Sequence, residues 1–247
     1  MENIIRTIEK SISPERMLGT ISELSSYHRI QASNGYAAAA RKCCDLLEGY
    51  GISAEIISYS ADYGLKIMNQ SLFPTWNCDS AWCRLVMSEG EGELLADYSA
   101  QPISVFQRSY ACDHCDAPLE IVMLDRGSDP ARYEGLDLKG KLIFVREDFY
   151  SYLDWAVRKG GALGILSDYV VSAEKVRTRQ DQWHVRKYTT FWWTEDDPSC
   201  RPFGFSLTPA QGEKLAVLCR RMEAEHASDQ TCSQYPKAIC RVDASFT

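Results

Sequence analysis

The sequence lacks the features that mark membrane, nucleic-acid-binding or exported proteins. No apolar run approaches the roughly 18 residues of a membrane-spanning helix. The opening residues, MENIIRTIEKSIS, are too polar for the core of a signal peptide. A net charge of -7 gives no electrostatic reason to expect nucleic acid or an anionic membrane as partner. We therefore predict a cytoplasmic protein that binds neither nucleic acid nor membrane.

The sequence also has few of the residues from which catalytic sites are built. It contains four histidines, no pair of adjacent glutamates and no glycine-rich loop with phosphate-binding spacing. A Ser-His-Asp or Cys-His set cannot be assigned from residue order, because such a set is defined by its geometry. These residues give no direct reason to assign nucleophilic or phosphoryl-transfer chemistry.

Cysteine, by contrast, is abundant. Ten cysteines in a small exported protein would indicate disulfides, but this sequence shows no export signal. We therefore expect reduced thiols, most of them buried as small apolar side chains. Cys43, Cys44, Cys219 and Cys240 fall in helical or strand patterns, and we interpret them as core residues.

The remaining composition is ordinary for a globular protein of 247 residues, enough for one large or two small domains. The clearest pattern lies in residues 133–167, where 141–145 and 162–166 are predicted to be short buried strands. Between them we predict a helix that Ser151 caps and that the glycines at 160–161 end. A helix that returns the chain to a strand of the same direction predicts a small α/β core.

The same residues carry a resemblance to a known family. The segments DLKGKLIFV (137–145) and AVRKGGALGI (156–165) resemble the signature of the protease-associated (PA) domain. In that family a strand is followed by a helix that ends in a glycine-containing turn. The resemblance implies a small PA-type domain with a binding or regulatory role. An unrelated βαβ segment is the alternative interpretation.

The first sixty residues predict two helices followed by a strand. Ser13-Pro14 is typical of a helix start, and Ser33 can cap a second helix. We predict a strand at 52–59. The predicted buried stripe of the second helix consists of Tyr36, Ala37, Ala40, Cys44 and Leu47.

This opening is similar to the N-terminal part of the family-28 zinc metallopeptidases, a superfamily that includes bacterial aminopeptidases. The matching residues include Arg29, Ser33, Gly35, Leu47 and Gly51. In that family, helices and a strand of the peptidase domain precede an inserted PA domain. The two resemblances therefore occur here in the order that the family shows.

Further strands and one further helix are predicted downstream. Residues 76–86 predict one or two strands, 89–93 an acidic turn, and 94–98 a short helix. Thr208 is predicted to begin a helix through a capping box with Gln211. The other predicted strands are 118–124, 203–207 and 238–246.

The family resemblance bears directly on catalysis. Family-28 peptidases hold two zinc ions with a His-x-Asp pair, a bridging Asp, a Glu-Glu pair, a further acid and a final His. In the family all of these follow the PA insert, and this sequence contains no such set after its PA-like segment. The resemblance therefore implies that the zinc-binding portion is absent, that this chain needs no cofactor, and that it is inactive as a peptidase by itself.

One cluster offers an alternative metal or redox site. The run Cys112-Asp113-His114-Cys115-Asp116 combines a Cys-x-x-Cys, which can bind zinc or cycle as a disulfide, with a His-x-Asp. No second Cys-x-x-Cys completes a set of four ligands. We therefore expect a structural or loop role for these residues, with metal binding by Cys112, His114, Cys115 and Asp116, or redox cycling, as the alternatives.

An aromatic cluster lies in the long polar connection 172–201. Its members are candidate binding residues because tryptophan and tyrosine are favoured at interfaces. Packing of this connection onto its own domain is the alternative. The candidate residues are Trp183, His184, Tyr188, Trp192 and Trp193.

Together these patterns predict an α/β (α+β) fold. We expect a small PA-type β-sandwich or βαβ domain at 101–225, preceded at 1–100 by helices and strands of an incomplete aminopeptidase-like domain and followed at 226–247 by a linker and return strand. The predicted role is non-catalytic: substrate access, protein binding or regulation, with a peptidase domain or another protein or peptide as partner. A stand-alone PA-type adaptor is the alternative. Apolar faces left without their sheet would favour self-association or docking.

Overall fold

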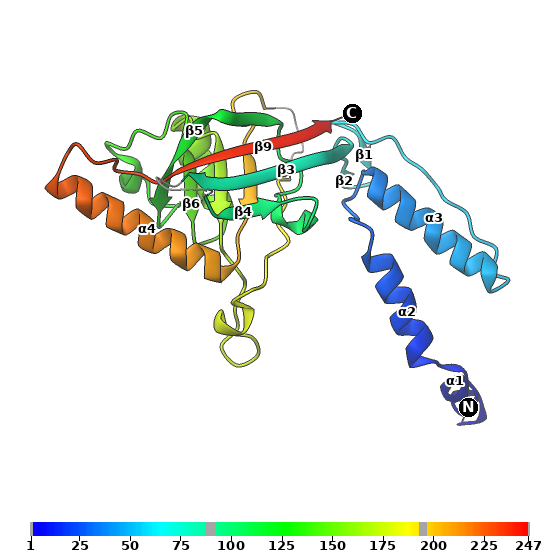
Figure 1. The fold of residues 1–247 in the computed structure, drawn as a ribbon. Helices are drawn as coiled ribbons and strands as arrows, with labels where there is room; N and C mark the ends of the chain where they lie inside the picture. The colour runs from blue at the N-terminus through cyan, green and yellow to red at the C-terminus, as the bar shows by residue number, and fades with distance from the viewer. Residues whose placement is uncertain (1, 87–91, 193–196, 247) are drawn as a thin grey trace. The chain divides into compact units, whose positions relative to one another are not determined.

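The computed structural model of the chain describes residues 2–86, 92–192 and 197–246 (Figure 1). Contacts within the chain divide it into two units, Met1–Asp62 and Tyr63–Thr247. This division does not coincide with the predicted boundaries at residues 100 and 225. Of the described helices, none combines the length and the apolar character needed to cross a membrane.

The first unit consists of three helices, and its predicted helix starts are confirmed. Ser13 accepts a hydrogen bond from the Arg16 amide, and Ser33 accepts one from the Tyr36 amide, so each serine satisfies an otherwise unpaired donor of the first turn. The Lys42 ammonium of the third helix lies 2.6 Å from a Glu23 oxygen of the second. The helices are α1 (Glu2–Ser11), α2 (Pro14–Ser25) and α3 (Asn34–Gly49).

Two predictions for this unit are wrong. The predicted stripe of α3 is not buried, since Tyr36 and Leu47 are exposed and Ala39 is the helix's buried residue. Residues 52–59 form no strand. A strand needs a partner for its backbone hydrogen bonds, and the described residues of this unit contain no strand that could supply one.

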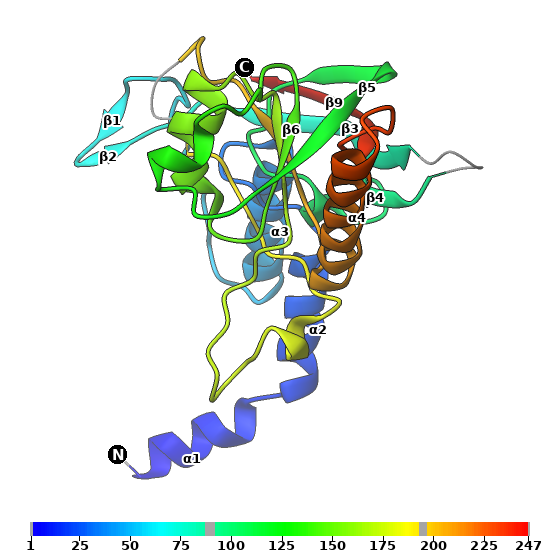
Figure 2. The ribbon, with the colours of Figure 1, turned by 90° about the vertical axis from the view of Figure 1, so that its left-hand side faces the viewer.

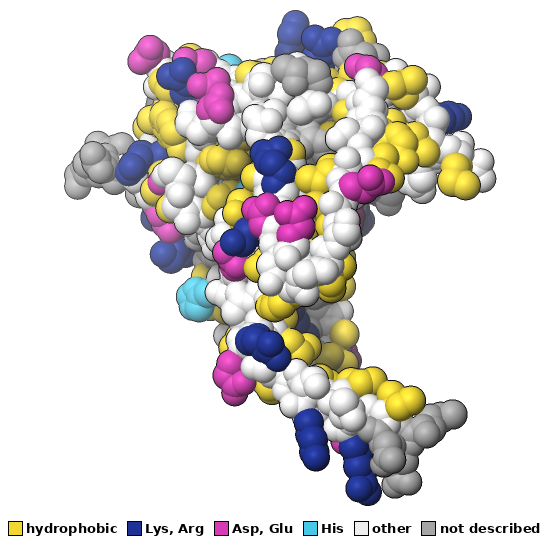
Figure 3. Space-filling model, turned by 90° about the vertical axis from the view of Figure 1, so that its right-hand side faces the viewer, with side chains coloured by type: hydrophobic (Ala, Val, Ile, Leu, Met, Phe, Trp, Pro, Cys, Tyr) yellow, Lys and Arg dark blue, Asp and Glu magenta, His cyan; other side chains and the backbone are white. Residues whose placement is uncertain are grey.

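The predicted exposure of apolar side chains is confirmed for the helices of this unit but is wrong for the return strand, where Ala238 is buried. Met17, Leu18 and Ile21 of α2 are 57%, 68% and 62% exposed. Figure 3 shows hydrophobic side chains at the surface of the N-terminal helices, beside lysines and arginines. Self-association or docking through these side chains stays a prediction.

The second unit is built on a seven-stranded mixed sheet with the order β4-β3-β9-β5-β6-β7-β8. A separate two-stranded hairpin, β1 (Lys66–Ile67) and β2 (Gln70–Ser71), precedes it. The sheet places strands from all three predicted segments, 1–100, 101–225 and 226–247, side by side. Its strands are β3 (Trp76–Val86), β4 (Leu94–Asp97), β5 (Cys112–Leu124), β6 (Leu142–Val145), β7 (Gly164–Ser167), β8 (Phe203–Ser206) and β9 (Lys237–Phe246).

Strand β5 joins the two halves of this sheet. Near its start it pairs antiparallel with β9, where Cys112 lies opposite Val242. Near its end it pairs parallel with β6, where Ile121 lies opposite Leu142. Strands β5 to β8 then run parallel in chain order. The mixed α/β fold and the predicted return of the chain between two parallel strands are therefore confirmed.

The segment between β6 and β7 differs from the prediction at its start. Asp148, and not Ser151, caps it by accepting a hydrogen bond from the Tyr150 amide. Ser151 instead lies inside a 3-10 helix, η3 (Phe149–Tyr152), which leads into the π-helix η4 (Leu153–Lys159). The predicted glycine stop is confirmed, since Gly161 adopts a φ of 73°.

The prediction of a short helix at residues 94–98 is wrong. Leu94–Asp97 instead forms edge strand β4, in which Ala96 lies opposite Cys83 of β3. Leu95 and Ala96 are buried, so tertiary pairing outweighs local helix propensity here. Most of the predicted turn at 89–93 lies outside the described residues.

Helical segments cover both faces of the sheet. Helix α4 (Pro209–Ser228) starts with the predicted capping box of Thr208 and Gln211 and buries Leu215, Ala216 and Cys219 against one face. Its position beside the strands is clear in Figure 2. Phe149, Tyr152 and other residues of η3 and η4 pack with the second core cluster, which includes Val122 and Ile143 of the sheet. This arrangement leaves the carboxyl edge of the parallel strands between the helical layers.

Candidate functional site

Charged residues directly follow three of the four parallel strands, β5, β6 and β7. Asp125 follows β5, Arg146 and Glu147 follow β6, and Asp168 follows β7. The carboxyl ends of parallel strands meet at one edge of the sheet, and ligand sites of open α/β sheets form outside that edge. This edge is therefore the first place to look for a site.

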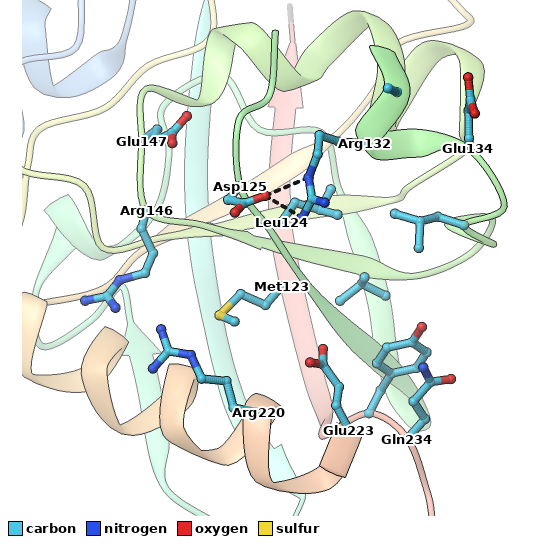
Figure 4. A pocket seen from close by; sticks show the side chains of 14 residues that line it. Met123, Leu124, Asp125, Arg132, Glu134, Arg146, Glu147, Arg220, Glu223 and Gln234 are labelled. Atoms are coloured by element: carbon cyan, nitrogen blue, oxygen red, sulfur yellow. Dashed lines mark hydrogen bonds and ion pairs between the residues drawn. The ribbon is translucent and has the colours of Figure 1, made fainter. Parts of the chain in front are cut away.

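A pocket of about 520 Å³ opens there (Figure 4), and we call it the carboxyl-edge pocket. It lies between the ends of β5 and β6, the 3-10 helix η2 (Pro130–Tyr133) and the second half of α4. Its volume is within the range of typical ligand sites. It is lined by Val122, Met123, Leu124, Asp125, Ala131, Arg132, Glu134, Leu136, Arg146, Glu147, Arg220, Glu223, Gln234 and Tyr235.

Part of the charge in the pocket is already compensated. Arg132 Nε donates to Asp125 Oδ1 over 2.8 Å, and its Nη2 lies 2.6 Å from the same oxygen. A Glu147 oxygen accepts a hydrogen bond from the Tyr152 hydroxyl over 3.2 Å. Burial raises the pKa of Tyr152, and the nearby Glu147 carboxylate adds to this effect. Tyr152 therefore remains a hydrogen-bond donor at neutral pH.

Arg146 is held at the edge of the pocket by two carboxylates. Its Nε lies 3.2 Å from Asp168 Oδ2, and its Nη2 lies 2.7 Å from Glu213 Oε2. Asp168 is 0% exposed and also binds Arg179 Nη2 at 2.5 Å. Burial raises the pKa of Asp168, although both arginines act in the opposite direction. Arg146 therefore has little freedom to move.

A glycine permits this arrangement. A Cβ atom on Gly212, in the first turn of α4, would lie 1.9 Å from Asp168 Oδ2. Only the absence of a side chain lets the helix approach the buried carboxylate so closely. The sequence Thr208-Pro209-Ala210-Gln211-Gly212 thus serves both the cap of α4 and the packing of the ion pair beneath it.

Arg220 and Glu223 are the charged side chains that α4 contributes to the pocket. Both project from α4 toward the strands (Figure 4). In the described part of the chain, Arg220 makes no ion pair. Burial raises the pKa of Glu223, and Arg220 offsets part of this shift. Helix α4 therefore presents one cation and one anion to the pocket, beside the apolar side chains of Met123, Leu136 and Tyr235, and the Glu134 carboxylate lines the pocket as well.

Comparison with known proteins gives the fold and little more. No protein-family model matches the sequence, and no curated protein matches it. The solved structure of a peptidase M28 precursor from Shewanella amazonensis SB2B matches with a TM-score of 0.53 and 10% identity, over 93% of this chain and 47% of that one. In fold, this chain is similar to part of an M28 peptidase.

Two further solved structures match less closely in shape. An aminopeptidase from Aneurinibacillus sp. strain AM-1 has a TM-score of 0.46 at 18% identity, covering 95% of this chain and 45% of that one. A putative peptidase from Clostridium acetobutylicum has a TM-score of 0.47 at 15% identity, covering 99% and 38%. The chain thus spans less than half the length of each of these three proteins. The resemblance to a PA domain stays a prediction.

The candidate binding residues of the aromatic cluster lie in two different parts of the second unit. Trp183 and His184 lie together beside the start of α4, in a second cavity of about 730 Å³ that also includes Gln211 and Val217. Trp192 lies elsewhere, 5.7 Å between ring centroids from Phe73. The guanidinium of buried Arg108 stacks over these two rings, 3.9 Å from Phe73 and 5.3 Å from Trp192.

The two remaining candidate aromatic residues are Tyr188 and Trp193. Tyr188 is half-exposed and contributes to the electrostatic surroundings of Arg108, whose pKa is lowered mainly by burial. Trp193 lies outside the described residues. The five residues therefore do not form one site in the described structure, and their role in binding stays a prediction.

The residues of the Cys-x-x-Cys cluster lie on β5. Cys112 and His114 share one face of the regularly paired part of this strand, whereas Cys115 lies in the stretch after His114 where the pairing with β9 is irregular. Among the described residues, no three His, Cys, Asp or Glu side chains are placed to hold a metal ion. Metal binding by Cys112, His114, Cys115 and Asp116 gains no support from this geometry.

The carboxyl-edge pocket itself was not predicted from the sequence. A signal for it was present, since a charged residue follows each of the predicted strands 118–124 and 141–145 directly. The sequence could not show that Arg220 and Glu223 line the pocket, because their position depends on how α4 packs across the sheet.

Proposed function

We propose that this chain is a peptidase-related protein that binds a polypeptide segment in its carboxyl-edge pocket without hydrolysing it. The observation that carries the proposal is the lining of this pocket. Arg220 and Glu223 offer one cation and one anion beside apolar side chains. An extended peptide with both acidic and basic side chains matches such a surface.

The similarity in fold to part of a solved M28 peptidase supports a relationship with peptidases. We propose that any hydrolysis is carried out by a partner and that this chain contributes binding. We propose that the bound segment belongs either to the substrate of such a peptidase or to the peptidase itself, which gives the chain a role in substrate access or regulation.

A binding titration with matched variants tests this function. The probe is a fluorescein-labelled peptide of alternating lysine, alanine and glutamate, and the readout is fluorescence anisotropy. We expect Arg220→Ala to weaken binding about tenfold, since a hydrogen bond to a charged group contributes about 1.5 kcal/mol. Arg221→Ala is the control, because Arg221 also lies exposed on α4 but pairs with Glu225 and does not line the pocket. Equal effects of the two substitutions, or no binding at all, would contradict the proposal.

The pH dependence of this binding is a second prediction. Because burial raises the pKa of Glu223, this carboxylate takes up its proton at a higher pH than an ordinary glutamate. Acidification from neutral pH should therefore weaken binding of the peptide's lysines before ordinary carboxylates titrate. In the Glu223→Gln variant, this early loss should be absent. If the variant and the unchanged chain lose binding over the same pH range, Glu223 is not the titrating group.

A further inference from the structure

Three cysteines from three neighbouring strands lie close together in the second unit. Strand β9 lies between β3 and β5, and it carries Cys240. Cys83 of β3 lies directly opposite Cys240. On β5, His114 lies opposite Cys240, which makes Cys112 its diagonal neighbour on the same face. All of these cysteines are free thiols.

The members of this cluster differ in their access to solvent. Cys83 and Cys240 are both 0% exposed, and burial contributes to a raised pKa in each. The register places Cys112 and Cys240 as diagonal neighbours on one face, and the Cys112 thiol is the largest cause of the raised pKa of Cys240. Cys112 itself is only half-buried at the margin of the core. A small oxidant can therefore reach Cys112 first, with Cys240 behind it.

The backbone between the two strands can adapt to a covalent link. Diagonal Cα atoms of a regular pair are about 7–8 Å apart, whereas a disulfide needs less than about 7 Å. The pairing of β5 with β9 is irregular between His114 and Leu119, beginning two residues after Cys112. A small shift of β5 at this irregularity would bring the Cys112 sulfur toward that of Cys240.

We propose that Cys112 and Cys240 form an oxidative modification site, in which a peroxide joins them as a disulfide that ties β5 to β9. Cys112 Sγ attacks a peroxide oxygen, the O–O bond breaks, and Cys112 becomes a sulfenic acid as water leaves. Cys240 Sγ then attacks the Cys112 sulfur, and the S–S bond forms as the second water leaves. Two thiols are oxidised and one hydrogen peroxide is reduced to two waters.

The pairing differs from the one that the Cys-x-x-Cys spacing would give. Cys112 lies in the regularly paired start of β5, whereas Cys115 lies in the irregular stretch between His114 and Leu119. The Cys115 amide is also held by Asp113 Oδ1 at 3.2 Å, and hydrogen bonding to Asp113 raises the pKa of Cys115. A disulfide between Cys112 and Cys115 would have to break this local geometry.

Peptide mapping of the full chain tests the proposal. The folded protein is treated with hydrogen peroxide, its remaining thiols are alkylated, and it is digested without reduction for mass spectrometry. We expect a linked pair of peptides that contain Cys112 and Cys240, lighter by about 2 Da than the two thiol peptides, because a disulfide forms with loss of two hydrogens.

Two variants make the outcome specific. Cys112→Ser should abolish the link, whereas Cys115→Ser should leave it unchanged. A link from Cys240 to Cys83, a link between Cys112 and Cys115, or oxidation of Cys112 to sulfinic acid without any link would each overturn the proposal. Cys115→Ser keeps both cysteines of the proposed pair. It therefore tests the pairing even if Cys112→Ser folds poorly.

Discussion

Replacing Trp76 with alanine is expected to lower the free energy of unfolding of Tyr63–Thr247 by about 4 kcal/mol, as for other buried aromatic side chains. Trp76 is 0% exposed and begins β3 opposite Phe246 of β9. Its indole Nε1 donates to the backbone oxygen of Ser109 over 2.9 Å. The substitution therefore leaves a cavity and also removes the donor from a buried carbonyl, which adds to the loss. Urea unfolding followed by circular dichroism measures the change.

Trp82→Ala is the matched control for this prediction. Trp82 lies on the same strand, but its side chain is only half-buried and lines a shallow surface cavity beside Asp97. Because water already reaches this indole, its truncation should cost clearly less than that of Trp76. Equal losses in the two variants would show that the interior of the sheet is not packed around Trp76.

Replacing Asp168 with alanine is expected to cost about 3 kcal/mol of unfolding free energy, at the lower end of the range for breaking a buried ion pair. The fully buried carboxylate contacts both Arg146 and Arg179. Its loss leaves two guanidinium groups without this partner beneath α4. These arginines are 26% and 32% exposed, so water compensates part of the loss.

The control for Asp168 is Asp154→Ala, which removes a carboxylate paired with Arg158 at the surface. Surface ion pairs contribute less than about 1 kcal/mol, so this variant should unfold close to the unchanged chain. Asp168→Ala should also weaken peptide binding, because Arg146 is then held by Glu213 alone. A chain of unchanged stability after loss of Asp168 would contradict the role assigned to this carboxylate.

The elements that the sequence predicts correctly are those with local signals. The capping residues Ser13, Ser33 and Thr208 act on amides within three residues, so their effect is visible in sequence order. The buried strands β6 and β7 are continuous apolar runs, which few other structures accommodate. Such features depend little on the rest of the chain.

The predictions that fail are those that need distant partners. Residues 52–59 have a strand-like composition but no neighbour to pair with, whereas 94–97 become a strand because β3 lies beside them. The carboxyl-edge pocket depends on such distant partners as well. Arg146 is fixed by Asp168 and Glu213, which follow it by 22 and 67 residues. No local pattern predicts which of the many charged residues will meet in this way.

The most direct test of binding without hydrolysis is to recover the bound peptide after prolonged incubation with the purified chain and zinc. The lysine, alanine and glutamate peptide is first shown to bind by anisotropy, then released and examined by mass spectrometry. We expect the peptide to bind in an Arg220-dependent manner and to be recovered intact. Recovery of peptide shortened from its N-terminus, in an amount that scales with protein concentration, would show instead that this chain is itself an aminopeptidase.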